Sequence, residues 1–330
     1  MLVAFTSPQG ATMLLFLAVL AVQIVLPILL ITGHAFLRPA TAPGLWLRTA
    51  SLLGLCGLLL MIGFWAFPPW WTPYVLVVLA ALTTWRAARL LRRLGPHPGR
   101  WRRWGEYALS SVLLVLVLLS LPGVIGGRKA PADAVDIAFP LEPARYLVMN
   151  GGHHPLLNAH FMTLNDPDLA EYRGQSFAVD LIGIDRIGWR ATTPVGTEDP
   201  ADYLIFGKRV LAPCDGTVIH AVGDMPDLPV PEVDLVDRGG NALMIDCGEV
   251  KVYLAHLRQD SLQVDVGDVV TTGMTLAEVG NSGHSGEPHL HVHAQRGTDP
   301  EAPLRGEPLP VTFDGRFPVK NARLVGSIRE

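Results

Sequence analysis

The sequence predicts an N-terminal four-helix transmembrane bundle followed by an all-β domain built on an antiparallel sheet. The mean hydropathy of the 330 residues is +0.32 and only 17% of them are charged, which is too apolar for an ordinary globular protein. Seven of the eight Trp lie in residues 1–125, whereas nine of the eleven His lie in residues 126–330. Short β-branched runs separated by Gly, Asp and Pro occur in the second part, and they are typical of antiparallel strands with tight turns.

The membrane anchor, residues 1–127, contains four apolar runs with Trp near their ends. A helix of about 20 apolar residues spans a hydrocarbon core, so the third run is short and needs the side chains of Arg86 and Arg89 to reach the interface. A cleaved signal peptide is the alternative for the first run. Residues 1–10 contain no Lys or Arg, however, so we expect a permanent span. The four runs lie at about residues 11–32, 50–67, 70–85 and 107–125.

Charge predicts the orientation of these spans. Residues 1–125 contain nine Arg, no Lys and a single acid, Glu106, and seven of the Arg lie between the third and fourth runs. Short basic loops stay in the cytoplasm, so we expect a multi-pass protein of a bacterial cytoplasmic (inner) membrane, with both termini outside. This role explains the arginines without a nucleic-acid partner, and no acid lies within a span to suggest a transporter. The seven are Arg86, Arg89, Arg92, Arg93, Arg100, Arg102 and Arg103.

The second part of the chain divides into three segments. We expect a polar linker at 128–144, the β domain at 145–300 and a C-terminal extension at 301–330. Within the β domain, residues 184–206 and 222–240 interrupt the strand pattern, and loops of this length are usually functional. We therefore expect these two loops to form the sides of a substrate groove, with their acidic residues facing positively charged groups.

The strongest chemical pattern is a strand that carries three histidines. Side chains alternate between the faces of a strand, so His289, His291 and His293 lie on one face while Leu290 and Val292 face the core. Neutral imidazole is a common zinc ligand, and two histidines spaced in this way point at one place. A surface row of histidines is the competing interpretation.

Two further polar residues interrupt apolar strands. Asp180 lies within FAVDLIG and His256 lies within VYLAHL. A buried acid is costly unless it is paired or bound to a metal, although either residue alone could be a hydrogen-bonded residue of the core. Together with the histidine strand, they supply the acid and the imidazoles that a hydrolytic zinc site requires.

The segments APCDGTVIHAV, GDVVTTGMTLAEVG and GNSGHSGEPHLHVHAQ, with YLAHL before the last two, resemble the lysostaphin-type zinc metallopeptidases, which cut peptide bonds in bacterial peptidoglycan. The resemblance covers about residues 145–297 and leaves out the membrane part. It implies one Zn²⁺ per peptidase domain. It also implies that Asp180 and His291 are zinc ligands and that His256 and His289 are the catalytic pair.

The chain departs from that family at the first zinc ligand. Members usually place a His four residues before the ligand Asp, and this chain has Ser176 there. A branch of the family resembling this chain has Asn-x-His upstream, which Asn158-Ala159-His160 matches, so we expect His160 as the third ligand. His153 and His154 are the alternatives.

The resemblance and the orientation together predict a membrane-anchored zinc metalloendopeptidase that acts on peptidoglycan cross-links outside the cytoplasmic membrane. The lipid bilayer and peptidoglycan peptides are the expected partners. A catalytically degenerate relative, acting as a cell-wall-binding or regulatory module, is the alternative. A biotin- or lipoyl-carrier module is disfavoured because neither Lys208 nor Lys251 lies at a hairpin tip. Cys214 and Cys247 could form a disulfide or remain two buried thiols.

Overall fold

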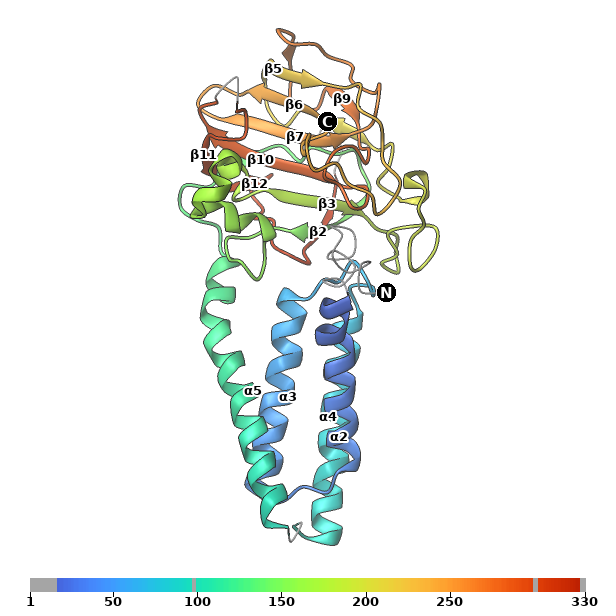
Figure 1. Ribbon diagram of the computed structural model, residues 1–330, viewed down its shortest axis with the longest axis vertical. Coiled ribbons are helices and arrows are strands. Elements are labelled where there is room, and N and C mark those ends of the chain that lie inside the picture. Colours follow the sequence, from blue (N-terminus) through green and yellow to red (C-terminus); the bar gives the residue numbers. More distant parts are fainter. Residues whose placement is uncertain (1–16, 97–98, 299–301, 327–330) are drawn as a thin grey trace. The chain divides into compact units, whose positions relative to one another are not determined.

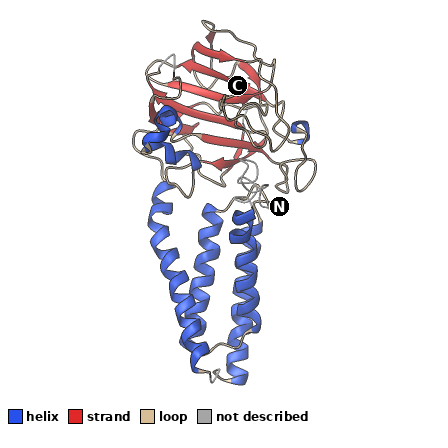
Figure 2. Cartoon of the chain, viewed as in Figure 1, coloured by secondary structure: helices blue, strands red, loops and turns tan. Residues whose placement is uncertain are grey.

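The computed structural model describes residues 17–96, 99–298 and 302–326 (Figure 1). The chain divides into two compact units, Met1–Val124 and Ile125–Glu330. Helices make up the first unit, and strands joined by loops and short 3₁₀ helices dominate the second, as Figure 2 shows. The predicted fold class, four apolar helices followed by a mostly antiparallel β domain, is therefore confirmed.

Four helices are long and apolar enough to cross a membrane. The third is longer than the apolar run that predicted it, because the helix continues through Arg86 and Arg89 to Leu94. Residues 11–16 of the first expected span lie outside the described residues. The four helices are Leu17–Phe36, which contains η2 (Ala21–Val25) and α2 (Leu26–Phe36), then α3 (Ala42–Ile62), α4 (Thr72–Leu94) and α5 (Arg100–Gly127).

The ends of these helices have local causes. The Thr41 side chain accepts a hydrogen bond from the Gly44 amide at 2.9 Å and so caps the start of α3. Gly95, with a φ of 67°, ends α4 in the left-handed region that glycine adopts without strain. Gln23 is buried, and its side-chain amide bonds to backbone groups of Phe64 and Phe67. These hydrogen bonds satisfy the polar atoms of Gln23, which an apolar environment could not do.

One nine-stranded sheet forms most of the β domain. Its strand order is β13-β2-β3-β10-β7-β6-β5-β8, with β11 also paired to β10, and every pairing within it is antiparallel. The strands are β2 (Arg145–Asn150), β3 (Val179–Gly183), β5 (Gly216–Val222), β6 (Asn241–Asp246), β7 (Lys251–Leu257), β8 (Val269–Val270), β10 (Leu290–Arg296), β11 (Glu307–Leu309) and β13 (Arg323–Val325).

Two small sheets accompany the large one. They pair β1 (Val135–Ile137) with β12 (Val311–Phe313) in parallel, and β4 (Arg209–Leu211) with β9 (Thr275–Glu278) antiparallel. Apolar side chains of both small sheets join those of the large sheet in one buried cluster, which includes Leu290 and Val292. Leu290 and Val292 therefore face the core, as predicted from strand alternation. The opposite face of β10 carries the buried residues His291 and His293.

The structure corrects the expected boundaries of the β domain. Residues 128–144 are not a linker throughout, because β1 pairs with β12 and because Ile137 and Leu141 belong to the buried core. Residues 301–330 are not a separate extension, because β11, β12 and β13 all pair with strands of the domain. In both segments a few apolar side chains, among them Ile137, Leu309 and Phe313, join the buried core of the domain.

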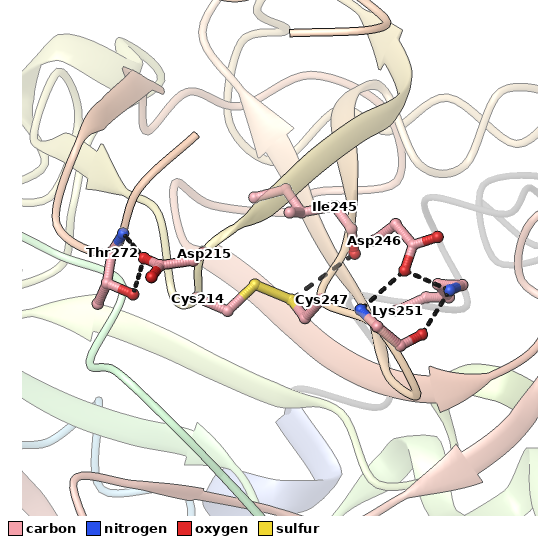
Figure 3. Close-up of a disulfide and its surroundings, with 8 residues drawn as sticks. Cys214, Asp215, Ile245, Asp246, Cys247, Lys251 and Thr272 are labelled. Atoms are coloured by element: carbon pink, nitrogen blue, oxygen red, sulfur yellow. Dashed lines mark hydrogen bonds and ion pairs between the residues drawn. A yellow bond between two sulfur atoms is a disulfide. The ribbon is translucent and has the colours of Figure 1, made fainter. Parts of the chain in front are cut away.

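The two cysteines of the β domain form a disulfide (Figure 3). Cys214 precedes β5 and Cys247 follows β6, and the antiparallel pairing of Thr217 with Asp246 brings these strand ends together. The disulfide therefore closes the end of a strand pair that the sheet already aligns. This resolves the choice that the sequence left open. Cys56 in α3 is a free, buried thiol.

Candidate metal centre

Three side chains that can bind a metal ion converge on the sheet face opposite the core. His291 on β10 lies directly opposite Asp180 on β3 in the strand register, and His291 Nδ1 is 3.1 Å from Asp180 Oδ1. His160 comes from the 3₁₀ helix η3 (Ala159–Leu164), and its Nε2 is 2.9 Å from Asp180 Oδ2. One donor atom from each of the three lies within 4.8 Å of the others.

The donor set fits a zinc ion. Zinc binds imidazole nitrogen and carboxylate oxygen at about 2.0–2.2 Å, which puts neighbouring donors roughly 3.3–3.6 Å apart around a tetrahedral ion. The separations of Asp180 from His160 and from His291, 2.9 and 3.1 Å, are a few tenths of an ångström shorter, so small side-chain shifts would accommodate the ion. Two imidazoles and one carboxylate are also a typical set for a catalytic zinc site, which keeps a fourth position open.

The two alternatives to His160 point elsewhere. His153 Nε2 bonds to the Lys129 carbonyl at 3.0 Å, and His154 Nδ1 accepts from the Leu156 amide at 3.2 Å. Neither is among the donors that converge on Asp180. Of the three upstream histidines, His160 is the one that the fold brings to the acid, and its role as a ligand stays a prediction.

A network of small polar side chains holds His160 in place. Asn158 Oδ1 accepts from the His160 amide, and Asn158 Nδ2 donates to the Ala178 carbonyl just before β3. Thr163 Oγ1 donates to the His160 carbonyl and lies 2.8 Å from Ser176 Oγ. Ser176, at the position where the related family usually has its first ligand, is thus fully buried and helps to fix the helix that carries His160.

Asn150 is a site residue that the sequence analysis missed. Its Nδ2 donates to Asp180 Oδ2 at 2.8 Å, and its Oδ1 accepts from the Ala159 amide at 3.2 Å, next to His160. A bulge between Val148 and Asn150 in the pairing of β2 with β3 brings Asn150 opposite Asp180. The Asn-Gly-Gly sequence after a strand was the only available sign of this role, and it does not distinguish the role from an ordinary turn.

His256 and His289 lie beside the three donors. Their ring centroids are 4.6 Å apart, and His289 Nε2 is 3.8 Å from Asp180 Oδ1. His256 Nδ1 is 2.9 Å from the Ser282 carbonyl, and His289 Nδ1 is 2.8 Å from the Glu287 carbonyl. A carbonyl oxygen can only accept, so the Nδ1 of each ring carries a proton, which leaves Nε2 as the atom that can exchange a proton with another group.

The backbone at His256 is unusual. Its φ of 63° lies in the left-handed region, which L residues with a side chain seldom adopt. The His256 amide donates to the Gly239 carbonyl at 3.3 Å, and its carbonyl accepts from the Gly280 amide at 2.9 Å. Neighbouring loops therefore hold His256 in a strained conformation, which is a common feature of functional positions.

Burial and mutual contacts shift the pKa values of the cluster. Burial acts to raise the pKa of Asp180, but charge interaction and hydrogen bonding with His160, together with His289 and His291, hold it well below 3.8. Burial lowers the pKa of His291, and it lowers that of His256 well below 6.5, with His289 adding to the effect. Asp180 is therefore a carboxylate, and His256 and His291 are neutral, at neutral pH.

A cavity of about 310 Å³ opens beside these groups. Arg238 and Gly239 of the loop 222–240 line it, whereas no residue of the loop 184–206 does. Instead, 184–206 is tied to the turn before His289 through a 2.7 Å ion pair between Arg190 and Glu287. The cavity is lined by Ala159, His160, Met162, Thr163, Leu169, Tyr172, Gln175, Arg238, Gly239, Tyr253, Ala255, His256, His284, His291 and Leu304.

One protein-family model matches part of the β domain. Residues 202–303 match Peptidase family M23, a segment that contains His256, His289 and His291 but neither His160 nor Asp180. Among curated proteins, none matches the chain.

Several solved peptidases match the chain at low identity. The lysostaphin catalytic domain from Staphylococcus simulans is 19% identical, with 38% of this chain and 71% of that chain covered and a TM-score of 0.25. A zinc-containing peptidase from Vibrio cholerae is 19% identical, with 52% and 38% covered and a TM-score of 0.29. A mutant catalytic domain of the prophage-encoded M23 protein EnpA from Enterococcus faecalis is 16% identical, with 54% and 95% covered and a TM-score of 0.30.

The chain thus spans less than half of the Vibrio peptidase. TM-scores this low add nothing to the assignment, which rests on the family match and on the histidines within it. Residues 202–303 of the β domain therefore match Peptidase family M23, and the match includes His256, His289 and His291.

Proposed function

We propose that this protein is a membrane-anchored zinc metalloendopeptidase that hydrolyses peptide bonds of peptidoglycan cross-links outside the cytoplasmic membrane. The observation that carries the proposal is the convergence of His160, Asp180 and His291 within 4.8 Å, with His256 and His289 beside them. This is the donor set and the pair of proton-transfer groups that metal-assisted peptide hydrolysis requires.

His160, Asp180 and His291 would hold the zinc ion, which when bound supplies a Lewis acid that polarises the scissile carbonyl and acidifies the attacking water. Asn150 supports this set by bonding to Asp180 Oδ2, which keeps the carboxylate aimed at the two imidazoles. The buried position of Asp180 and His291 keeps bulk water from competing for the donors.

His256 and His289 transfer protons in this scheme. In each ring the Nδ1–H donates to a backbone carbonyl, which holds the ring in place and leaves Nε2 available for proton transfer. One of the two accepts the proton of the attacking water through Nε2. The other, once protonated, donates to the oxyanion that develops on the carbonyl, a contribution on the order of 3 kcal/mol for one well-placed donor.

The membrane part and the disulfide both favour an extracytoplasmic site. The arginine-rich segment between α4 and α5 favours a cytoplasmic position for that loop, and the β domain then lies on the other side. A disulfide between Cys214 and Cys247 persists in oxidising compartments and is rare in a bacterial cytosol. Peptidoglycan lies on that side of the membrane, and family M23 contains cell-wall peptidases.

The test is cleavage of purified sacculi by the zinc-loaded full chain in detergent, with products identified by mass spectrometry as new amine and carboxyl ends. His256→Ala and His289→Ala should each lower turnover by about 10²–10⁴-fold. His154→Ala, in a histidine that does not face the cavity, should leave it unchanged. A wild-type protein that binds zinc and sacculi but cuts no bond would instead be a degenerate binding module.

A further inference from the structure

His293 is the third histidine of the β10 face, and the proposed chemistry leaves it without a role. It lies two residues after His291 on the same face and is completely buried, with 0% exposure. It stacks at 5.1 Å against Tyr253, its partner in the strand register. A phenylalanine would fill the same space without a polar atom, so an imidazole here needs an explanation.

One ring nitrogen of His291 and one of His293 lie within hydrogen-bond distance of each other. His291 Nε2 is 3.0 Å from His293 Nδ1, and the two rings are almost perpendicular, at 80°. The other nitrogen of His291, Nδ1, is the one that faces Asp180. His291 thus presents one nitrogen to the donor cluster and the other to His293.

This arrangement permits only one productive placement of the proton. If Nδ1 of His291 is to bind a metal, it must keep its lone pair, so the proton of the neutral ring must sit on Nε2. That N–H then needs an acceptor, and His293 Nδ1 is within hydrogen-bond distance of it. Among the described residues, His293 Nε2 forms no well-aligned hydrogen bond, although the Gln295 side chain lies close enough to interact with His293. The contact of Nδ1 with His291 is therefore the well-formed hydrogen bond of this imidazole.

We propose that His293 is a positioning residue of the metal centre: it accepts the Nε2–H of His291 and thereby fixes the tautomer and ring orientation in which His291 Nδ1 binds zinc. Groups in this position commonly orient a ligand histidine and raise its basicity, and their loss typically costs 10–100-fold in metal affinity. The inference rests on the proposed zinc centre, but it does not depend on which peptide bond is cleaved.

The first test measures zinc affinity of the full chain in detergent by competition with a chelator. His293→Phe keeps a ring against Tyr253 but removes the acceptor, and it should weaken zinc binding by about 10–100-fold. His293→Asn retains an acceptor near the position of Nδ1 and should recover most of that loss. The Co²⁺-loaded His293→Phe protein should also show a shifted visible absorption spectrum, which a change in packing alone would not produce.

The chain offers a matched control on the other side of Tyr253. His220 on β5 lies 6.3 Å from that ring at the same 32° tilt as His293, but it does not contact His291. His220→Phe should leave zinc affinity unchanged. Equal zinc affinities in wild type, His293→Phe and His220→Phe would overturn the role of His293, whereas a wild-type chain that binds no zinc would overturn the proposed metal centre itself.

A second measurement uses the wild-type chain alone, so its result does not depend on whether a variant folds. In the zinc-loaded wild-type chain with ¹⁵N-labelled histidine, NMR should find the shared proton on Nε2 of His291 and an unprotonated Nδ1 on His293. A proton on His293 Nδ1 would contradict the proposal, whatever the behaviour of the substituted proteins.

Discussion

At the scale of single residues, His160 reaches Asp180 from the 3₁₀ helix η3 and not from a strand of the sheet. Ser176, four residues before Asp180, contacts Thr163, which in turn bonds to the His160 carbonyl. Ser176 thus supports the segment that carries His160. The site depends on this support, because η3 has no strand pairing of its own.

The first prediction concerns zinc content. His160→Ala should reduce the zinc bound per chain from one ion to a small fraction, because only Asp180 and His291 would remain as protein ligands. His153→Ala is the matched control and should retain one zinc, since its imidazole bonds to the Lys129 carbonyl. The measurement is metal analysis of the purified full chain, and retention of zinc in His160→Ala would refute the ligand assignment.

The second prediction distinguishes the roles of two histidines, His289 and His291, that lie two residues apart at the start of β10. His291→Ala should lose zinc, because its Nδ1 faces Asp180. His289→Ala should keep most of its zinc and lose turnover, because its Nδ1 is held by the Glu287 carbonyl and its Nε2 lies 3.8 Å from the acid. Zinc content and cleavage rate are measured on the same samples. Equal zinc loss in both would show that the two roles are assigned wrongly.

At the scale of elements, the cavity lies over the central strands β7 and β10, and 3₁₀ helices and loops form the rest of its lining. Residues of η3 and η4 (Pro167–Gln175) supply one part of its lining, and Arg238 and Gly239 supply another. Arg238 stacks over Tyr172 at 5.3 Å and, among the described residues, has no ion pair with an acid. The cavity lining contains no Asp or Glu, so the acidic residues of the two long loops do not contribute to it.

The third prediction follows from this charge. An uncompensated guanidinium favours a carboxylate on the bound peptide, so Arg238→Gln should raise KM by about tenfold for peptides with a free carboxylate near the scissile bond. The same peptides with that carboxylate amidated should show little change. Arg186→Gln, in an exposed residue of the loop that does not line the cavity, is the control. Identical KM values for Arg238→Gln and wild type would remove Arg238 from substrate binding.

At the scale of the whole molecule, the chain combines four candidate membrane spans with a β domain that carries a disulfide. The helices can be predicted from the length of each apolar run, whereas the β domain depends on pairings between segments far apart in sequence. β1 with β12 and β13 with β2 are examples, because they join residues near 140 to residues beyond 310. Deletion of the last 30 residues should therefore destabilise the whole β domain, because it removes β11, β12 and β13.

The fourth prediction concerns topology. A reporter fused after Gly127 should be active only outside the cytoplasm, because the arginine-rich loop between α4 and α5 resists translocation. In cells, Cys214 and Cys247 should be protected from thiol reagents until a reductant is added. Cytoplasmic reporter activity, or two free thiols in that domain, would contradict both the orientation and the proposed cell-wall substrate.

The sequence by itself determined everything that depends on local periodicity. Apolar length predicted the four helices, and strand alternation put Leu290 and Val292 in the core with His291 on the opposite face. Prediction of the disulfide would also have required the antiparallel pairing of β5 with β6. The helices and the strand faces could be predicted because each is a property of one segment, whereas the disulfide could not, because it depends on the pairing of two strands.

Only the tertiary structure decided which upstream histidine meets Asp180 and which polar residues support the cluster. His153, His154 and His160 have the same chemistry and similar spacing from Asp180, and what separates them is the path of the chain between β2 and β3. Asn150 reaches Asp180 through a bulge, and β12 and β13 join the domain through pairings across more than a hundred residues. Such contacts arise from how all segments fill one core together, so no single segment specifies them.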